Sequence, residues 1–305
     1  MDFIIKILFD SLSFAAPILL CTLGGLFAYK ANVINIGLEG MMLFGGFIAA
    51  LIIFWTENII FGFIAMMILA VLLGLLFSFF GITKKANFII TGFAINLLAI
   101  AVGRYTLALF GSTDINVVGI VDRSTLKIDI WGIKSIPIVG DLFSGHTILT
   151  YVSFILIIVV SIVMYKTKFG TYVRVVGESE EAAKSVGIKV NFIKYMAIIV
   201  GSILCGFAGF NVAIEQLAFY THEITAGTGF IAIAAIYCGR GKPSTAAIYA
   251  ILFGLAQSLS INLALHIGSI AGLLKMIPYI TIILVLSIVG FYRKKQTMYR
   301  GFIHE

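Results

Sequence analysis

Long apolar runs restrict what this chain can fold into more than any other feature. Nine of them contain few or no charged residues: 3–28, 32–54, 58–82, 87–110, 149–166, 191–215, 226–240, 244–265 and 270–291. A helix needs about 20 apolar residues to cross the hydrocarbon core of a bilayer, whereas barrel strands would show as segments of about ten residues with alternating polarity. The sequence therefore predicts an all-α, polytopic helical membrane protein, a single transmembrane domain over residues 1–305, with about nine transmembrane helices (eight to ten).

The charges indicate how this domain lies in the membrane. Charged residues make up 11% of the chain, against about a quarter in a soluble domain. Basic residues cluster after the third, fifth, seventh and ninth runs, in the ranges 84–85, 166–189, 240–242 and 293–300. By the positive-inside rule these loops face the cytoplasm, which predicts an outer N-terminus and a cytoplasmic C-terminal tail, residues 292–305. The net charge of +7 then serves orientation and contact with membrane lipid, and no nucleic acid is expected.

Cysteines and histidines give no sign of a metal or of catalysis. Cys21, Cys205 and Cys238 all fall in apolar runs, without the spacing of a metal site, so neither a metal nor a disulfide is expected. The four histidines are dispersed and most acidic residues lie in loops. A membrane enzyme would instead gather acids or histidines at several span ends, so we expect no catalytic residue.

A polar, glycine-rich stretch interrupts the second apolar run. Asn35–Gly46 reads NIGLEGMMLFGG and contains Glu39 and four glycines. A carboxylate at the centre of the bilayer costs roughly 2.5–3.5 kcal/mol on insertion scales, so Glu39 must face protein or a wet cavity. The glycines bring backbones together and let the helix break. Two interpretations stay open: a helix contact in which Glu39 is hydrogen-bonded to a neighbour, or a wall of a solute pathway.

A second glycine-interrupted segment, Gly227–Gly241, follows in the other half of the chain. Paired interrupted segments often mark the binding region of a transporter. Close helix packing through glycine is the alternative.

Two loops are long enough to have a function. Residues 111–148 form an extracytoplasmic loop, which we expect to be a small cap that is either a connector or a contact for a partner. The cytoplasmic loop 167–190 contains Gly177–Ile188, which predicts a short surface helix with Ser179 or Gly177 as its cap and Gly187 as its end. Glu178, Glu180 and Glu181 lie in its first turn, and Ala182 and Ala183 offer a low-relief face to another protein.

Several stretches together resemble one family. Glu181-Ala182-Ala183 followed by Gly187 resembles the loop by which ABC importer permeases dock on their ATPase. The segments VINIGLEGMM (33–42), TGFAINLL (91–98), GTGFIAIAAI (227–236) and GRGKP (239–243) resemble permeases that import nucleosides and simple sugars such as ribose. The resemblance extends from about residue 14 to residue 292 and its motifs stand in family order. At Thr228 and Ile224 the chain departs from the family, which commonly has arginine and methionine there.

The resemblance implies the shorter subunit of a permease pair in a bacterial plasma membrane. Its expected partners are an ABC ATPase, a second homologous permease in a heterodimer, and an extracytoplasmic substrate-binding lipoprotein. The chain itself is expected to bind no cofactor, with ATP and Mg on the ATPase. Gly241-Lys242 is not a phosphate loop, because Ile236 stands at the first glycine position and Pro243 replaces the Ser or Thr. The coupling residues implied are Glu178, Glu181, Ala182, Ala183 and Gly187.

A pathway for a neutral polar solute needs uncharged hydrogen-bonding groups. The candidates are Asn35, Glu39, Asn96, Asn211, Gln216, Gln257 and Asn262. Each could instead make an interhelical hydrogen bond, worth about 0.6 kcal/mol on average in membranes. Nucleosides are the expected solute, and ribose or galactose the alternative. A proton- or sodium-coupled transporter would also place Glu39 in a broken helix, but it would not need the alanine-containing docking helix.

Overall fold

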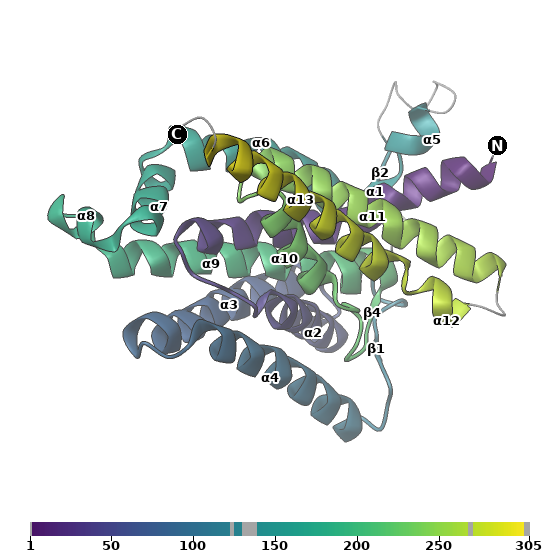
Figure 1. Cartoon of the computed structure of the whole chain (residues 1–305). Helices are drawn as coiled ribbons and strands as arrows, with labels where there is room; N and C mark the ends of the chain where they lie inside the picture. Colours follow the sequence, from purple (N-terminus) through teal and green to yellow (C-terminus); the bar gives the residue numbers. More distant parts are fainter. Residues whose placement is uncertain (1, 123–124, 130–138, 268–270, 302–305) are drawn as a thin grey trace.

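The computed structural model describes residues 2–122, 125–129, 139–267 and 271–301 (Figure 1). Eight helical segments in these residues are long and apolar enough to cross a membrane. They are α1 (Asp2–Lys30), α2 (Leu38–Thr56), α3 (Ile59–Ser78) continued by the π-helix η1 (Phe79–Thr83), α4 (Phe88–Leu109), α6 (Ile148–Lys166), α9 (Val190–Phe210) continued by the π-helix η2 (Asn211–Leu217), α11 (Pro243–His266), and α12 (Ala271–Leu274) followed by α13 (Ile277–Gly301). The predicted all-helical membrane fold is confirmed.

The predicted span at residues 226–240 is wrong in length. The helix there, α10 (Thr228–Cys238), has 11 residues. At a rise of 1.5 Å per residue it is about 16 Å long, roughly half of a hydrocarbon core of about 30 Å. The described residues therefore contain eight helical segments long enough to cross a membrane, within the predicted range, and α10 is a shorter apolar helix beside them.

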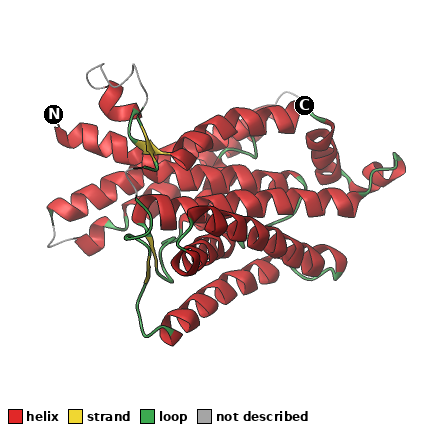
Figure 2. Cartoon of the chain, turned by 180° about the vertical axis from the view of Figure 1, so that it is seen from behind, coloured by secondary structure: helices red, strands yellow, loops and turns green. Residues whose placement is uncertain are grey.

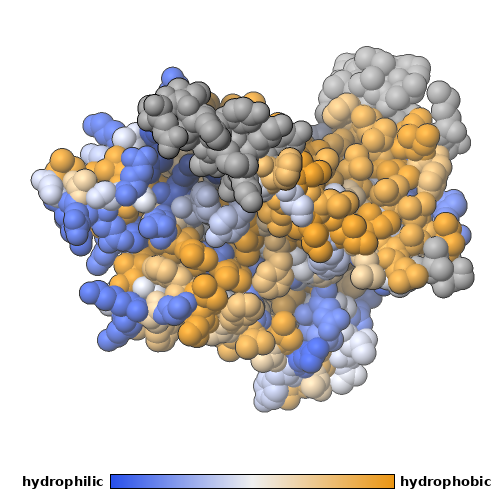
Figure 3. All heavy atoms as spheres, viewed as in Figure 1, coloured by the Kyte–Doolittle hydropathy of each residue, from blue (hydrophilic) through white to orange (hydrophobic). Residues whose placement is uncertain are grey.

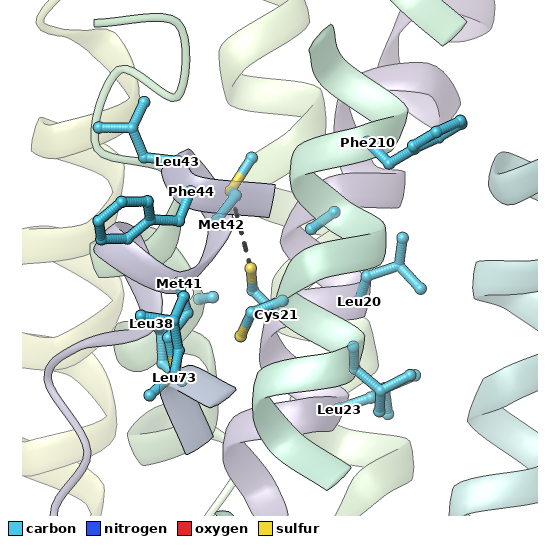
Figure 4. Close-up of a cluster of buried hydrophobic side chains, with 14 of the residues drawn as sticks. Leu20, Cys21, Leu23, Leu38, Met41, Met42, Leu43, Phe44, Leu73 and Phe210 are labelled. Atoms are coloured by element: carbon cyan, nitrogen blue, oxygen red, sulfur yellow. Dashed lines mark hydrogen bonds between the residues drawn. The ribbon is translucent and has the colours of Figure 1, made fainter. Parts of the chain in front are cut away.

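Helix α1 is at the centre of the bundle, in contact with α6, α9, α10 and α11. Helix α2 packs between α3, α4, α9 and α10. Figure 4 shows buried side chains of α1 and α2 facing one another, with the Cys21 thiol 3.7 Å from the sulfur of Met42. The side of the molecule shown in Figure 3 is largely apolar away from its ends, as contact with lipid requires.

Glycines set how closely α2 approaches α9. A Cβ added at Gly45 would lie 2.7 Å from the Cα of Gly206, and one at Gly46 would lie 2.9 Å from the carbonyl oxygen of Gly209. Neither position has room for a larger residue without a shift of backbone. The expectation that these glycines bring backbones together is confirmed.

The two long loops lie at opposite ends of the bundle. Helices α7 (Lys168–Glu178) and α8 (Glu180–Ser185) project at one end, and the N-terminus, α5 (Val139–Phe143) and α12 lie at the other in both views (Figures 1 and 2). The described part of the loop 111–148 contains three two-residue strands, β1 (Ile115–Asn116), β2 (Lys127–Ile128) and β3 (His146–Thr147). Strand β1 pairs antiparallel with β4 (Phe219–Tyr220), and β2 pairs antiparallel with β3. Residues 130–138 of this loop and 302–305 of the predicted tail lie outside the described residues.

Candidate functional site

The connection between α1 and α2 is an extended segment inside a run that is apolar enough to be helical. The second predicted span starts at residue 32, but α2 begins only at Leu38, with Gly37 as its N-cap. The amide oxygen of Asn35 accepts a hydrogen bond from the Gly37 N–H at 2.9 Å. Because this side chain completes a local turn, it competes with helix formation at the break. The sequence allowed for a break in this glycine-rich stretch, and the structure has one before Leu38, inside the predicted span 32–54.

Glu39 joins the start of α2 to the start of α10. Its carboxylate accepts hydrogen bonds from the Thr225 hydroxyl at 2.6 Å and from the backbone N–H groups of Gly227 at 2.9 Å and Gly229 at 2.5 Å. The first N–H groups of a helix have no partner within the helix, and the helix dipole favours a negative group at that end. Glu39, which is 9% exposed, therefore caps α10 from a different helix.

Gly229 allows this approach. A Cβ at position 229 would lie 2.5 Å from the Glu39 nitrogen and 2.6 Å from its Cα. Both contacts would be with backbone, so a side chain at this position would have to push α2 and α10 apart. The two glycine-interrupted segments found in the sequence therefore meet at Glu39.

Asn96 of α4 holds the other side of the break. Its amide oxygen accepts from the Gly40 N–H at 2.7 Å, and its amide nitrogen donates to the carbonyl oxygen of Ile36 at 3.1 Å. One buried carboxamide thus satisfies two backbone groups that the break leaves without helical partners. The structure brings together Asn35, Glu39 and Asn96, three of the predicted pathway residues. Asn35 and Asn96 bond to backbone at the break, and Glu39 bonds to backbone at the start of α10.

A second polar cluster lies in η2. Asn211 donates to the Thr147 hydroxyl at 3.1 Å and to Glu215 at 2.7 Å, and Gln216 donates to the Asn211 oxygen at 2.8 Å and to the carbonyl oxygen of Ser13 at 2.9 Å. The Glu215 carboxylate also accepts from the Leu149 N–H at the start of α6, at 3.2 and 3.3 Å. Asn211 and Gln216 therefore form their own network around Glu215.

Glu215 is buried near the end of the sixth apolar run, with 4% of the residue exposed. The π-helical turn carries it toward the bundle, where it caps a helix as Glu39 does. One feature of the sequence could have indicated this burial. Asn211 and Glu215 are four residues apart, which places both on one helix face.

The two predicted residues of α11 differ in their contacts. Asn262 donates to the Asp10 carboxylate of α1 at 3.0 Å and to the carbonyl oxygen of Ser258 at 3.1 Å. This is the interhelical hydrogen bond that the sequence offered as the alternative to a pathway role. The side-chain oxygen of Gln257 is buried and has no hydrogen-bond partner among the described residues.

A short helix forms in the loop 167–190, but it is shorter than the predicted Gly177–Ile188. Helix α8 spans Glu180–Ser185, and Glu178, expected in its first turn, is the last residue of α7. The Ser179 hydroxyl accepts from the Ala182 N–H at 3.2 Å, and Gly187, with φ of +79°, follows the end of α8. Glu178 and Glu181 are exposed. The two alanines differ, however: Ala182 is exposed, whereas Ala183 is buried within the chain. The expected low-relief face therefore includes Ala182 but not Ala183.

A buried lysine that the sequence analysis did not single out fixes this helix to the bundle. Lys194 of α9 is 6% exposed and forms an ion pair with Glu180 of α8. This hydrogen bond with Lys194 lowers the pKa of the Glu180 carboxyl from its ordinary value. A charged residue inside the apolar run 191–215 was the signal that could have identified it.

Comparison with known proteins identifies the class. Residues 7–286 match the family model described as the permease component of the branched-chain amino acid transport system. The chain therefore belongs to this permease family, and it is a permease component of an ABC transport system.

Three relatives show how the family is used elsewhere. The guanosine ABC transporter permease protein NupQ of Bacillus subtilis (strain 168) is 32% identical over 92% of this chain and 90% of its own length. The nucleoside ABC transporter permease protein NupC of Lactococcus lactis subsp. cremoris (strain MG1363) is 29% identical, with the same shares covered. A putative glucose ABC transporter permease protein of Haloferax volcanii is 30% identical over 94% of this chain and 92% of its own length. No solved structure gives a significant match.

Proposed function

We propose that this permease imports nucleosides across a bacterial plasma membrane, with ribose- or galactose-type sugars as the second candidate. The observation that carries the proposal is the pair of interrupted spans that meet at Glu39, because such breaks often mark the binding region of transporters. The names of the guanosine and nucleoside permeases favour nucleosides. The putative glucose permease among the relatives keeps a sugar as the alternative.

We infer that the driving energy comes from a separate ATPase that holds ATP and Mg. Gly241-Lys242 lies between helices α10 and α11, and Pro243 is the first residue of α11. A phosphate loop follows a strand and requires Ser or Thr after its lysine. Movement of α7 and α8 by the ATPase would be transmitted through rigid helices to the pathway. The remaining partners proposed are a second permease, paired as a heterodimer, and an extracytoplasmic substrate-binding lipoprotein.

Uptake in cells that carry the whole system tests the solute. Labelled guanosine should accumulate in a manner that depends on this chain, and unlabelled nucleosides should compete while ribose, galactose and glucose should not. Competition by a free sugar alone would select the sugar proposal. Loss of uptake with an uncoupler at constant ATP would instead indicate an ion-coupled transporter.

The exposed alanine tests the contact with the ATPase. Ala182→Trp places a bulky side chain on the outer face of α8 and should abolish co-purification with the ATPase, while the permease stays in the membrane at normal amounts. Thr113→Trp, an exposed position in the loop at the opposite end of the bundle, is the control and should change neither. Unchanged co-purification of the Ala182→Trp variant would contradict docking through α8.

A further inference from the structure

The extended segment Val33–Ile36 connects α1 and α2, which are each long and apolar enough to cross a membrane. Its position beside the apolar helix α10 indicates that it lies at membrane depth. It ends next to Glu39, where α2 and α10 meet, and α10 extends from that point for about 16 Å, half of the hydrocarbon thickness. Val33–Ile36 lines a small cavity of about 80 Å³ whose other walls come from α1 and α10. A larger pocket of about 390 Å³ shares Val33 and Ile34 with this cavity and extends to Arg174 and Glu178 of α7.

The backbone of this segment is not satisfied within the chain. Among the described residues, no hydrogen bond uses the N–H groups of Ile34, Asn35 or Ile36, or the carbonyl oxygens of Val33, Ile34 and Asn35. The backbone groups that flank this unpaired stretch are hydrogen-bonded. The Val33 N–H donates to the carbonyl oxygen of Ala28, and the Ile36 carbonyl oxygen accepts from the Asn96 side chain. Six consecutive backbone polar groups therefore have no hydrogen-bond partner in the part of the chain that the structure describes.

Such a segment cannot face lipid. An unsatisfied backbone group in hydrocarbon costs several kcal/mol, so irregular backbone is tolerated at membrane depth only where protein buries it or where it lines a water-filled cavity. This chain buries Val33 and Asn35, which are 2% and 9% exposed, but it leaves Ile34 45% exposed and Ile36 only half-buried. Only water or a second protein can satisfy these groups.

We propose that Val33–Ile36 lines the inner half of the translocation path and that its free N–H and C=O groups bind the solute in transit. The inference rests on the proposed transport function and adds to it the site of contact. Backbone donors and acceptors beside the apolar side chains of Ile34, Ile36 and Ile233 suit an uncharged solute that has both hydrogen-bonding groups and an apolar ring. Charged groups do not line the small cavity; Lys30, Arg174 and Glu178 lie in the larger pocket at its cytoplasmic mouth.

Thiol labelling tests this placement. Ile34→Cys is compared with Ile68→Cys on α3, a position that is 58% exposed on the outside of the bundle, both in a variant that lacks Cys21, Cys205 and Cys238. Inverted membrane vesicles that carry the full complex are treated with a positively charged thiol reagent, without nucleotide and after vanadate trapping. Ile34→Cys should react at least about tenfold faster than Ile68→Cys in one of these states, because the reactive thiolate forms in water and not in lipid.

The solute supplies the second measurement. Saturating guanosine should slow the labelling of Ile34→Cys, as expected if the solute occupies the cavity. Labelling that is slowed by a sugar but not by guanosine would keep the placement and reject nucleosides. Equal rates for Ile34→Cys and Ile68→Cys in both states, as expected if the second permease covers the segment, would overturn the proposal. The proposal would also be overturned if no transported solute slowed the labelling of Ile34→Cys.

Discussion

At the scale of single residues, Glu39 acts as an acceptor for three donors rather than as an isolated charge in the membrane. All three donors come from the segment that opens α10, so the carboxylate ties the two interrupted spans together. These bonds explain why an acidic residue persists in an apolar run. They also leave room for the proposed solute pathway to run beside Glu39. Glu39 holds the two interrupted segments in place, and the backbone groups of residues 33–36 are the ones that we propose contact the solute.

The charge of Glu39 can be tested by Glu39→Gln. The carboxamide replaces one acceptor oxygen by an NH₂ group that faces N–H donors, so the variant should lose about 1–3 kcal/mol of stability and most of its uptake. The measurement is the midpoint of heat-induced unfolding of the purified complex, with uptake in parallel. Thr225→Val is the matched control, since it removes one donor and leaves both glycine N–H bonds, and it should cost less. A Glu39→Gln variant with wild-type midpoint and uptake would show that the carboxylate is dispensable.

Gly229 offers a steric test of the same contact. Gly229→Ala would place a methyl group 2.5 Å from the backbone nitrogen of Glu39 and should destabilise the complex by about 1–3 kcal/mol, the usual cost of overpacking. Gly290→Ala on α13, with no atom within 4 Å of the added Cβ, should leave the unfolding midpoint unchanged. Equal midpoints for the two variants would mean that α2 and α10 are not in close contact.

The sequence predicted part of this site because its residues carry their own signal. Glu39 and the glycines stand out in an apolar run, and so do Asn35 and Asn96, which the structure places at the same break. Their partners could not be predicted: the donors to Glu39 are two backbone N–H groups and a threonine 186 residues away in the chain. Backbone donors have no signature in the side-chain sequence. The burial of Glu215 was missed for a related reason, since it depends on a π-helical turn.

At the scale of elements, the apolar runs predicted the long helices well. The predicted spans 87–110, 149–166 and 244–265 agree with the helices to within one residue at each end. Hydropathy failed where helix and extended chain are equally apolar, at residues 32–37 and in α10, because it measures transfer to lipid and not backbone conformation. Capping residues, by contrast, indicated where α8 begins and ends: Ser179, one of the two predicted caps, precedes it, and Gly187 follows its last turn.

The docking of α8 on α9 should depend on pH. Because the hydrogen bond with Lys194 lowers the pKa of the Glu180 carboxyl from its ordinary value of 4.5, the ion pair is fully present above that value and is lost as the pH falls through the lowered pKa. Hydrogen exchange of the α8 amides, corrected for intrinsic rates, should therefore rise in acid. Glu180→Gln should show fast exchange at neutral pH and lose this dependence, whereas Glu181→Gln, at an exposed position, should retain it. Identical profiles for the two variants would exclude Glu180 as the group responsible.

At the scale of the whole molecule, the two loops at opposite ends of the bundle must lie on opposite sides of the membrane. Helices α7 and α8 project from the end near the loop between α3 and α4, where a groove of about 930 Å³ is lined by Lys85, Lys184, Lys189 and Lys194. This concentration of lysines agrees with a cytoplasmic location by the positive-inside rule. The loop 111–148 should then be outside.

Impermeant thiol reagents measure this orientation directly. The three native cysteines are buried, so cysteines introduced at exposed positions dominate labelling. In intact cells Thr113→Cys should react and Ser185→Cys, on α8, should not, whereas in inverted vesicles the order should reverse. Both positions are exposed in the folded chain, so a difference reports the side of the membrane and not burial. Labelling of Ser185→Cys from outside would place α8 on the side opposite to ATP. It would thereby remove the physical basis for coupling this permease to a cytoplasmic ATPase.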